Sequence, residues 1–293
     1  MEPSAFPEDG RSTAERSANR LRRFRFPVLF IPLFAVMLAV VGIDTLVAPL
    51  PLLALPVGLG LGVVGIACYR WLYRKVEQRE DLPELAVRDR WSGLLRGTLL
   101  GFALFCALML LIVVFGGLDG LSWGSFFGAL GLAGMMFSVA TMEEVLFRGV
   151  LFRILEERAG TVISLVVSSL LFGATHLVNV NATLWGALAI GLTGGAMLAS
   201  AYVLTRSLWF PIGLHFAWNF THAGLFGIAV SGSDDVPDGL LRTTLSGPSV
   251  VTGGVFGPEA SLFALLVCGA ATVVLLRRAA RAGRIRARVQ RGS

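Results

Sequence analysis

The chain has 293 residues, of which 55% are hydrophobic and 15% are charged, and its mean hydropathy is +0.74. Ordinary soluble domains carry about 25% charged residues. A water-soluble fold of this size could not bury so much apolar surface, whereas each helix that crosses a membrane uses roughly 20 apolar residues. The composition therefore excludes an ordinary soluble protein and predicts an all-α, polytopic integral membrane helix bundle.

The net charge of +6 comes from basic residues that lie in short blocks between apolar segments. This distribution is typical of membrane topology rather than of nucleic-acid binding. We therefore expect membrane lipid around the chain and no nucleic-acid partner. The three cysteines, Cys68, Cys106 and Cys268, are isolated in apolar runs and lack the spacing of metal ligands.

Eight apolar runs of spanning length follow a polar, Arg-rich start. They cover residues 26–48, 52–73, 97–116, 125–147, 161–180, 184–205, 207–230 and 260–276. The expected organisation is a disordered basic tail at 1–25, three helices within 26–124, a core of four helices at 125–230, a flexible outer loop at 231–259, and a last helix with a basic tail at 260–293.

Basic residues collect in every second connection between these runs. The segments that carry them are the first tail, the stretch from Arg70 to Arg96, the connection with Arg153 and Arg158, the connection with Arg206, and the tail that starts at Arg277. The remaining connections are acidic or uncharged on balance. This alternation predicts a multi-pass protein of a cell membrane, such as a bacterial inner membrane, with both termini in the cytoplasm.

Ionisable side chains inside a bilayer cost about 3 kcal/mol each and therefore mark candidate functional sites. The apolar runs hold seven notable polar groups: Glu143, Glu144, Arg148, His176, His215, Asn219 and His222. Glu144 and Arg148 have the four-residue spacing of a helical ion pair. Glu143 projects about 100° away on the helix, which leaves its carboxylate available to act as a general base.

Helix arithmetic predicts that these groups share one layer of the bundle. The turn signal Ala159-Gly160 divides two runs, and Glu143 and His176 lie at nearly equal distances from it. His215 lies nine residues beyond Arg206, or about 14 Å along a helix. A carboxylate to deprotonate water, imidazoles to hold water or a metal, and an amide to stabilise an oxyanion together indicate a hydrolytic site.

Three segments carry a family resemblance. They are Glu143-Glu144-Val-Leu-Phe-Arg148, Phe172-Gly-Ala-Thr-His176 and His215-Phe-Ala-Trp-Asn219. In order and spacing they resemble the EExxxR, FxxxH and HxxxN motifs of the CPBP family, the CAAX proteases and bacteriocin-processing enzymes, also called the Abi family. The resemblance implies an intramembrane endopeptidase that opens toward the cytoplasm and cleaves a membrane-associated peptide or protein.

The same resemblance implies roles for the residues. Glu143 would activate water together with His176, Glu144 and Arg148 would organise the site, and His215 with Asn219 would stabilise the oxyanion. The family has been described both as metal-dependent and as metal-free. A zinc site with one open position would use His176, His215 and Glu143, so the cofactor stays open between zinc and none.

His222 lies outside the family pattern, and we expect it to have a structural or supporting role. Two other functions stay open for the whole chain. One is a catalytically silent membrane scaffold or bacteriocin-immunity factor, in which loss of Glu143 would have no effect. The other is a proton-coupled transporter, in which Glu143 and the histidines would form a proton relay.

Overall fold

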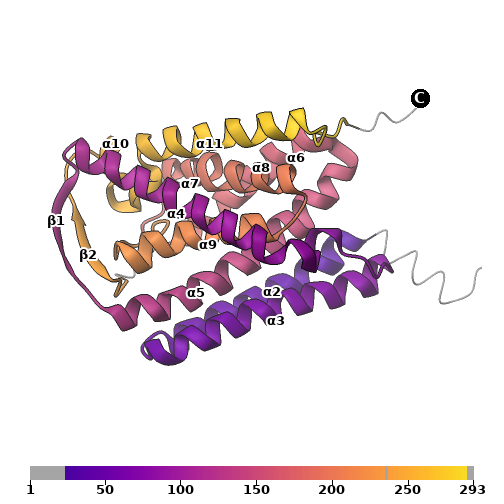
Figure 1. Cartoon of the computed structure of the whole chain (residues 1–293), viewed down its shortest axis with the longest axis horizontal. Coiled ribbons are helices and arrows are strands. Elements are labelled where there is room, and N and C mark those ends of the chain that lie inside the picture. Colours follow the sequence, from indigo (N-terminus) through magenta and orange to yellow (C-terminus); the bar gives the residue numbers. More distant parts are fainter. Residues whose placement is uncertain (1–23, 235–236, 289–293) are drawn as a thin grey trace, which may run out of the picture.

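The computed structural model describes residues 24–234 and 237–288. This part of the chain is a bundle of helices that run roughly along the long axis of the molecule (Figure 1). The expected all-α, polytopic membrane fold is confirmed, because the helices are long and apolar enough to cross a bilayer. The expected disordered tail at 1–25 lies almost entirely outside the described residues.

The α-helices are α2 (Arg25–Val47), α3 (Pro51–Glu77), α4 (Arg90–Val114), α5 (Phe126–Glu144), α6 (Arg153–Thr175), α7 (Leu184–Ile190), α8 (Ala196–Thr205), α9 (Trp209–Asn219), α10 (Ser249–Thr252) and α11 (Leu262–Arg281). Three π-helical segments continue or join them: η3 (Val145–Phe152), η5 (Gly191–Gly195) and η6 (Phe220–Leu225). Five 3-10 turns lie in the connections: η1 (Pro83–Leu85), η2 (Val87–Asp89), η4 (His176–Val178), η7 (Gly254–Phe256) and η8 (Pro258–Ala260).

Six helical segments of the described chain have the length and composition of membrane spans. One of them, Phe126–Val178, is 53 residues long and bends at Gly160, so it contains two of the eight spans expected from the sequence. The span expected at 207–230 corresponds to α9 followed by η6, which is not among the six. The number of spans and the cytoplasmic location of the termini stay predictions.

Gly160 makes the bend between the two halves of this long segment. Its φ of 77° and ψ of 170° lie outside the helical region, in a conformation that glycine adopts without steric cost. A Cβ atom at this position would lie 2.8 Å from the backbone nitrogen of Arg288 and 2.9 Å from the carbonyl oxygen of Arg286. The glycine turn expected at this place is therefore confirmed, and it also allows the C-terminal segment to pack against the bend.

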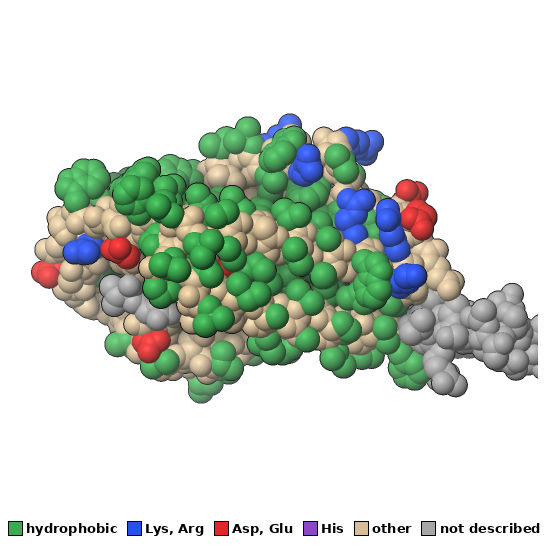
Figure 2. Space-filling model, turned by 90° about the horizontal axis from the view of Figure 1, so that it is seen from below, with side chains coloured by type: hydrophobic (Ala, Val, Ile, Leu, Met, Phe, Trp, Pro, Cys, Tyr) green, Lys and Arg blue, Asp and Glu red, His purple; other side chains and the backbone are tan. Residues whose placement is uncertain are grey.

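Connections that carry basic residues meet at one end of the bundle, which we call the basic end. Glu156 pairs with Arg206 at 3.0 Å and with Arg286 at 3.5 Å, and Glu77 pairs with Arg153 at 3.1 Å. Figure 2 shows Lys and Arg side chains gathered toward this end and hydrophobic side chains across the flank beside it. Separate connections thus converge on one charged rim, as the alternation of charge along the sequence predicts.

The opposite end carries Asp119, Asp234, Asp238 and Glu259, and we call it the acidic end. Here strand β1 (Leu118–Trp123) pairs with β2 (Leu241–Leu245) in an antiparallel two-stranded sheet (Figure 1). The sequence prediction had no strand and a flexible loop over 231–259. Within the described residues 237–259, that segment instead holds β2, α10 and the turns that lead into α11.

Helices α4 and α9 pack backbone against backbone. A Cβ atom at Gly97 of α4 would lie 2.1 Å from the carbonyl oxygen of Phe210, and one at Gly213 of α9 would lie 2.3 Å from that of Leu94. Such contacts leave no space for a side chain, which is why small residues occupy close helix crossings in membrane proteins. This crossing fixes the position of α9, the helix that carries His215 and Asn219.

Candidate active site

Three helices bring the expected site residues together: Glu143 and Glu144 end α5, His176 follows α6, and His215 and Asn219 lie on α9. Directly beyond these residues, α5 passes into the π-helical segment η3 and α9 passes into η6. Short π-helical stretches inside helices occur frequently at functional sites. On both helices, the change of helical pitch therefore coincides with the candidate site.

Glu144 is the centre of a buried polar network. Its Oε1 accepts a hydrogen bond from Arg148 Nη1 at 2.9 Å and lies 2.9 Å from His215 Nδ1. The side chains of Glu144 and Arg148 are 0% and 1% exposed. The ion pair expected from their spacing is confirmed, and it includes His215 as a third member. Since a carboxylate paired with Arg only accepts hydrogen bonds, His215 donates through Nδ1.

Arg148 also connects the parts of the bundle around the site. Its Nη2 donates to the carbonyl oxygen of Gly195 at 2.9 Å, and its guanidinium carbon lies 4.8 Å from the ring centroid of Phe172. A cation over an aromatic face is attracted by the electron density of the ring. Arg148 thus holds η5 and α6 against the end of α5, while the ion pair with Glu144 compensates its charge.

Glu143 has different surroundings from its neighbour Glu144. Its side chain is 13% exposed, and its Oε2 lies 3.6 Å from His215 Nε2. No Lys or Arg of the described residues pairs with it. His215 therefore stands between the two carboxylates, with Nδ1 toward the buried Glu144 and Nε2 toward the accessible Glu143.

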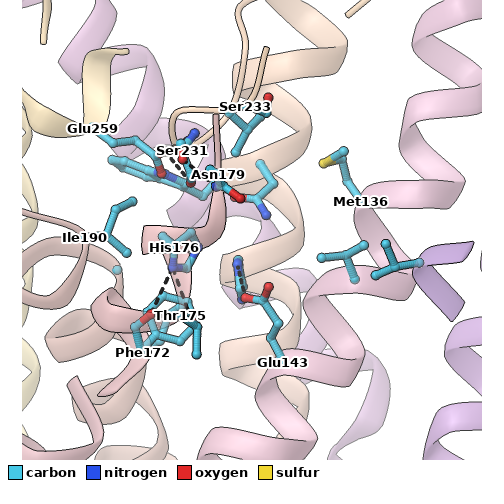
Figure 3. Close-up of a pocket in the computed structure, with 18 of the residues that line it drawn as sticks. Met136, Glu143, Phe172, Thr175, His176, Asn179, Ile190, Ser231, Ser233 and Glu259 are labelled. Carbon is cyan, nitrogen blue, oxygen red and sulfur yellow. Dashed lines mark hydrogen bonds and ion pairs between the residues drawn. The ribbon is translucent and has the colours of Figure 1, made fainter. Parts of the chain in front are cut away.

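His176 enters the same pocket from the end of α6. Its Nδ1 lies 2.9 Å from the carbonyl oxygen of Phe172 and 3.5 Å from Thr175 Oγ1. A carbonyl oxygen only accepts, so Nδ1 carries the proton and Nε2 of the neutral ring is an acceptor. Figure 3 shows His176 and Glu143 reaching toward the pocket from separate helices.

Asn219 lies one helical turn beyond His215 and is 7% exposed. In the described part of the chain its side-chain amide makes no hydrogen bond, and it lines the pocket. Because the amide NH₂ is an uncharged donor, Asn219 can bind an oxygen atom of a molecule in the pocket without first breaking a bond to the protein.

The pocket has a volume of about 410 Å³. Its polar wall contains Glu143, His176, His215 and Asn219. Much of the remaining wall is apolar and comes from α2 and α5, with the side chains Met37, Leu38, Val41, Met136 and Val139. An apolar cavity with a few convergent polar groups is the usual form of a binding site.

The sequence resemblance led us to expect a site that opens toward the cytoplasm, and this orientation stays a prediction. Loop residues of the acidic end, Asn179, Ser231, Ser233 and Glu259, form part of the pocket wall. Figure 3 shows these four residues on the opposite side of His176 from Phe172. None of the charged residues that form the ion pairs of the basic end lines the pocket.

We tested whether His176, His215 and Glu143 fit a metal ion. Across residues 24–234 and 237–288, no group of three or more His, Cys, Asp or Glu side chains is arranged so that it could hold one. His215 Nδ1 contacts Glu144 and His176 Nδ1 contacts the Phe172 carbonyl, which leaves Nε2 of each ring as the nitrogen available to a ligand. The choice between zinc and no metal therefore stays a prediction.

His222 does not line the pocket. It is 0% exposed, its ring lies 4.7 Å from that of Phe105, and neither ring nitrogen has a hydrogen-bond partner within the described residues. Its Nδ1 is 3.8 Å from Glu259 Oε2. The structural or supporting role expected for His222 stays a prediction.

Glu259 is a pocket residue that the sequence reasoning missed. It is 4% exposed and accepts hydrogen bonds from Trp218 Nε1 at 2.7 Å and from Ser231 at 2.9 Å and 2.7 Å. The sequence shows it only as one acidic residue of a Gly-rich connection. Its position directly before an apolar span was the one available signal, because charges there are costly to bury.

Fold and site together define a polytopic helical membrane protein with a buried carboxylate–histidine centre open to a pocket. Residues 103–221 match the profile of a family described as "Type II CAAX prenyl endopeptidase Rce1-like". The match contains all six expected site residues, and it confirms the resemblance to the CPBP family. The family description points to an intramembrane protease of the CAAX type. No curated protein and no solved structure matches the chain.

Proposed function

We propose that the chain is an intramembrane endopeptidase that hydrolyses a peptide bond of a membrane-associated peptide or protein. One observation carries the proposal: Glu143, His176, His215 and Asn219, from three helices, line a single pocket. These residues lie in the segment that matches an endopeptidase family. The surrounding membrane is a cell membrane, such as a bacterial inner membrane, with both chain termini in the cytoplasm.

Glu143 is the general base in this proposal. Its carboxylate is accessible from the pocket and forms no ion pair with an Arg of the described residues, so it can take a proton from a bound water. His176 presents Nε2 as an acceptor because Nδ1 is held by Phe172, and it orients the same water. General bases placed in this way contribute about 10²–10⁴-fold to a rate.

The water oxygen attacks the carbonyl carbon of the scissile bond and produces an oxyanion. Asn219 donates its amide N–H to that oxyanion. His215, one turn earlier on α9, would add a second donor through Nε2 when both of its ring nitrogens carry protons, since Nδ1 donates to Glu144. The proton on Glu143 then passes to the amide nitrogen as the C–N bond breaks. Glu144 and Arg148 are positioning residues, because they fix the orientation of the His215 ring.

The experiment that tests this function compares peptide termini in cells that contain the wild-type protein, Glu143→Gln or Glu80→Gln. Glu80 is 84% exposed in a connection at the basic end, so Glu80→Gln is a matched acid-to-amide control. We expect new termini with the wild type and with Glu80→Gln, and their loss with Glu143→Gln. The metal content of the purified protein, measured in parallel, decides between a zinc-dependent and a metal-free site.

Other results would contradict the proposal. New termini that persist with Glu143→Gln would remove Glu143 as the general base. A biological effect of the protein that is the same for wild type and Glu143→Gln, without any new termini, would support a scaffold or immunity factor. Uptake driven by a pH gradient in proteoliposomes, again without cleavage, would support a transporter.

A further inference from the structure

Asn219 is the one site residue whose side chain no other part of the described chain holds. Its amide lines the pocket and makes no hydrogen bond within the described residues. It is also the last residue of α9, because the helix takes π-helical pitch from Phe220 onward. A donor that must meet an oxyanion needs a fixed position, since a displacement of about 1 Å can cost about 10²-fold in rate. Neighbouring groups must therefore fix this end of α9.

The neighbouring residue, Trp218, is held on two sides. Its Nε1 donates to Glu259 Oε1 at 2.7 Å, and its ring packs edge to face on Phe105 at a centroid distance of 4.9 Å. Hydrogen bonds to an ionised acceptor are shorter and stronger than those between neutral groups. The bond to Glu259 therefore gives the end of α9 a side-chain anchor directly beside Asn219.

Glu259 also holds the segment that follows η6. Its Oε2 accepts hydrogen bonds from the backbone nitrogen of Ser231 at 2.9 Å and from Ser231 Oγ at 2.7 Å. One carboxylate thus connects Trp218, just before the π-helical segment, with Ser231 in the loop beyond it. Figure 3 shows Glu259 beside Ser231 in the wall of the pocket.

The turn that carries Glu259 is itself anchored. Glu259 lies in η8, and Trp185 Nε1 donates to the carbonyl oxygen of Ala260 at 2.9 Å. Directly after this turn, Ser261 Oγ accepts from the backbone nitrogen of Ala264 at 3.1 Å and caps α11. Glu259 therefore offers Trp218 an acceptor whose own position is fixed.

We propose that Glu259 is a positioning residue for the hydrolytic site. Through Trp218 it fixes the end of α9, so that the amide of Asn219 points into the pocket. Both oxygens of the Glu259 carboxylate bind protein donors, so the role does not include contact with the reacting atoms. The inference rests on the proposed function, in which Asn219 donates to the oxyanion.

A first experiment follows the amide of Asn219 itself and requires no protease activity. The chain has four asparagines, so ¹⁵N labelling of their side chains in the detergent-solubilised protein gives few signals, and Asn219→Ala identifies the one from Asn219. We expect this signal to shift in Glu259→Gln, which replaces one of the two acceptor oxygens, and in Trp218→Phe, which removes the indole donor and keeps an aromatic ring.

Trp209→Phe is the matched control for loss of an indole hydrogen bond. Trp209 begins the same helix, is buried, and donates through Nε1 to the carbonyl oxygen of Ala86 at 3.1 Å. It does not line the pocket. We expect the amide signal of Asn219 to be the same in Trp209→Phe as in the wild type.

A second experiment measures cleavage of a peptide identified by the mapping of termini. Glu259→Gln and Trp218→Phe should each lower kcat, by up to about 10²-fold, whereas Trp209→Phe should leave it unchanged. In an Asn219→Ala background, Glu259→Gln and Trp218→Phe should lower kcat no further, because the group that they position is already absent. Such non-additivity is expected of residues that act as one unit.

Several results would overturn the inference. An Asn219 signal that is unchanged in both Glu259→Gln and Trp218→Phe would show that the contact does not orient the amide. Losses of kcat that multiply with that of Asn219→Ala would assign Glu259 an independent structural effect, and a change in KM alone would assign it to substrate binding. If Glu259→Gln does not fold, Trp218→Phe decides alone. Because the amide signal does not depend on cleavage, a failure of positioning and a failure of the proposed function are distinguishable.

Discussion

Two neighbouring regions of the bundle use the same residue types for different purposes. In the buried polar network, Glu144 is 0% exposed and pairs with Arg148 and His215. In the pocket wall, the adjacent Glu143 is 13% exposed and, among the described residues, pairs with His215 Nε2 at 3.6 Å. The difference teaches that one step along a helix separates a carboxylate that holds the structure from one that can react.

Removal of the positive charge of Arg148 from the buried network should have the largest effect. Arg148→Ala leaves Glu144 as an uncompensated buried charge, so we expect a loss of about 3–5 kcal/mol of stability together with all activity. Thermal unfolding in detergent measures the first effect. Arg88→Ala, at a side chain that is 87% exposed, is the control. A normal melting temperature for Arg148→Ala would contradict the pairing.

A double variant sharpens this comparison. Replacing both members of the pair, as in Glu144→Leu with Arg148→Met, leaves neither charge of the pair in the buried network. Apolar replacements of buried ion pairs are often neutral or stabilising, so the double variant should regain much of the folded protein lost in Arg148→Ala. It should remain inactive, because His215 loses the partner of its Nδ1. Activity equal to that of the wild type would show that the pair does not position His215.

In the pocket wall, Asn219→Ala should lower kcat without lowering stability. Loss of one donor to an oxyanion costs about 10²–10³-fold in kcat, and Asn219 makes no side-chain hydrogen bond that folding would lose in the described structure. The measurement uses a peptide identified by the mapping of termini. An effect on KM alone, with kcat preserved, would assign Asn219 to substrate binding instead of the oxyanion.

The smallest effect is expected for His222→Phe. His222 is fully buried, packs on Phe105 and has no hydrogen-bond partner among the described residues. Replacing such a group by an apolar one of similar shape is nearly neutral or stabilising. We expect the melting temperature and the cleavage rate to stay near those of the wild type. A strong fall in kcat would instead give His222 a part in the chemistry.

Much of the arrangement around Glu143 and Glu144 could be predicted from the sequence, because helix periodicity determines which residues share a face of a helix. The pairing of Glu144 with Arg148 and the common pocket of Glu143 and His176 followed from spacing and from the turn at Gly160. Both depend on contacts within one helix or one hairpin. Such local geometry is what the 3.6-residue period encodes.

The acidic end could not be predicted in the same way. Its sheet joins β1 to β2 across more than a hundred residues, and its Gly-, Ser- and Pro-rich sequence indicated a loop. Glu259 reaches the pocket only because that end folds over the bundle, where it binds Trp218 and Ser231.

The most direct test of the central claim measures stability and peptide cleavage together in Glu143→Gln and Glu144→Gln. The account predicts that Glu143→Gln keeps the wild-type melting temperature and loses cleavage, whereas Glu144→Gln loses both. Equal melting temperatures for the two variants, or cleavage that survives in Glu143→Gln, would contradict the division of roles between these adjacent carboxylates.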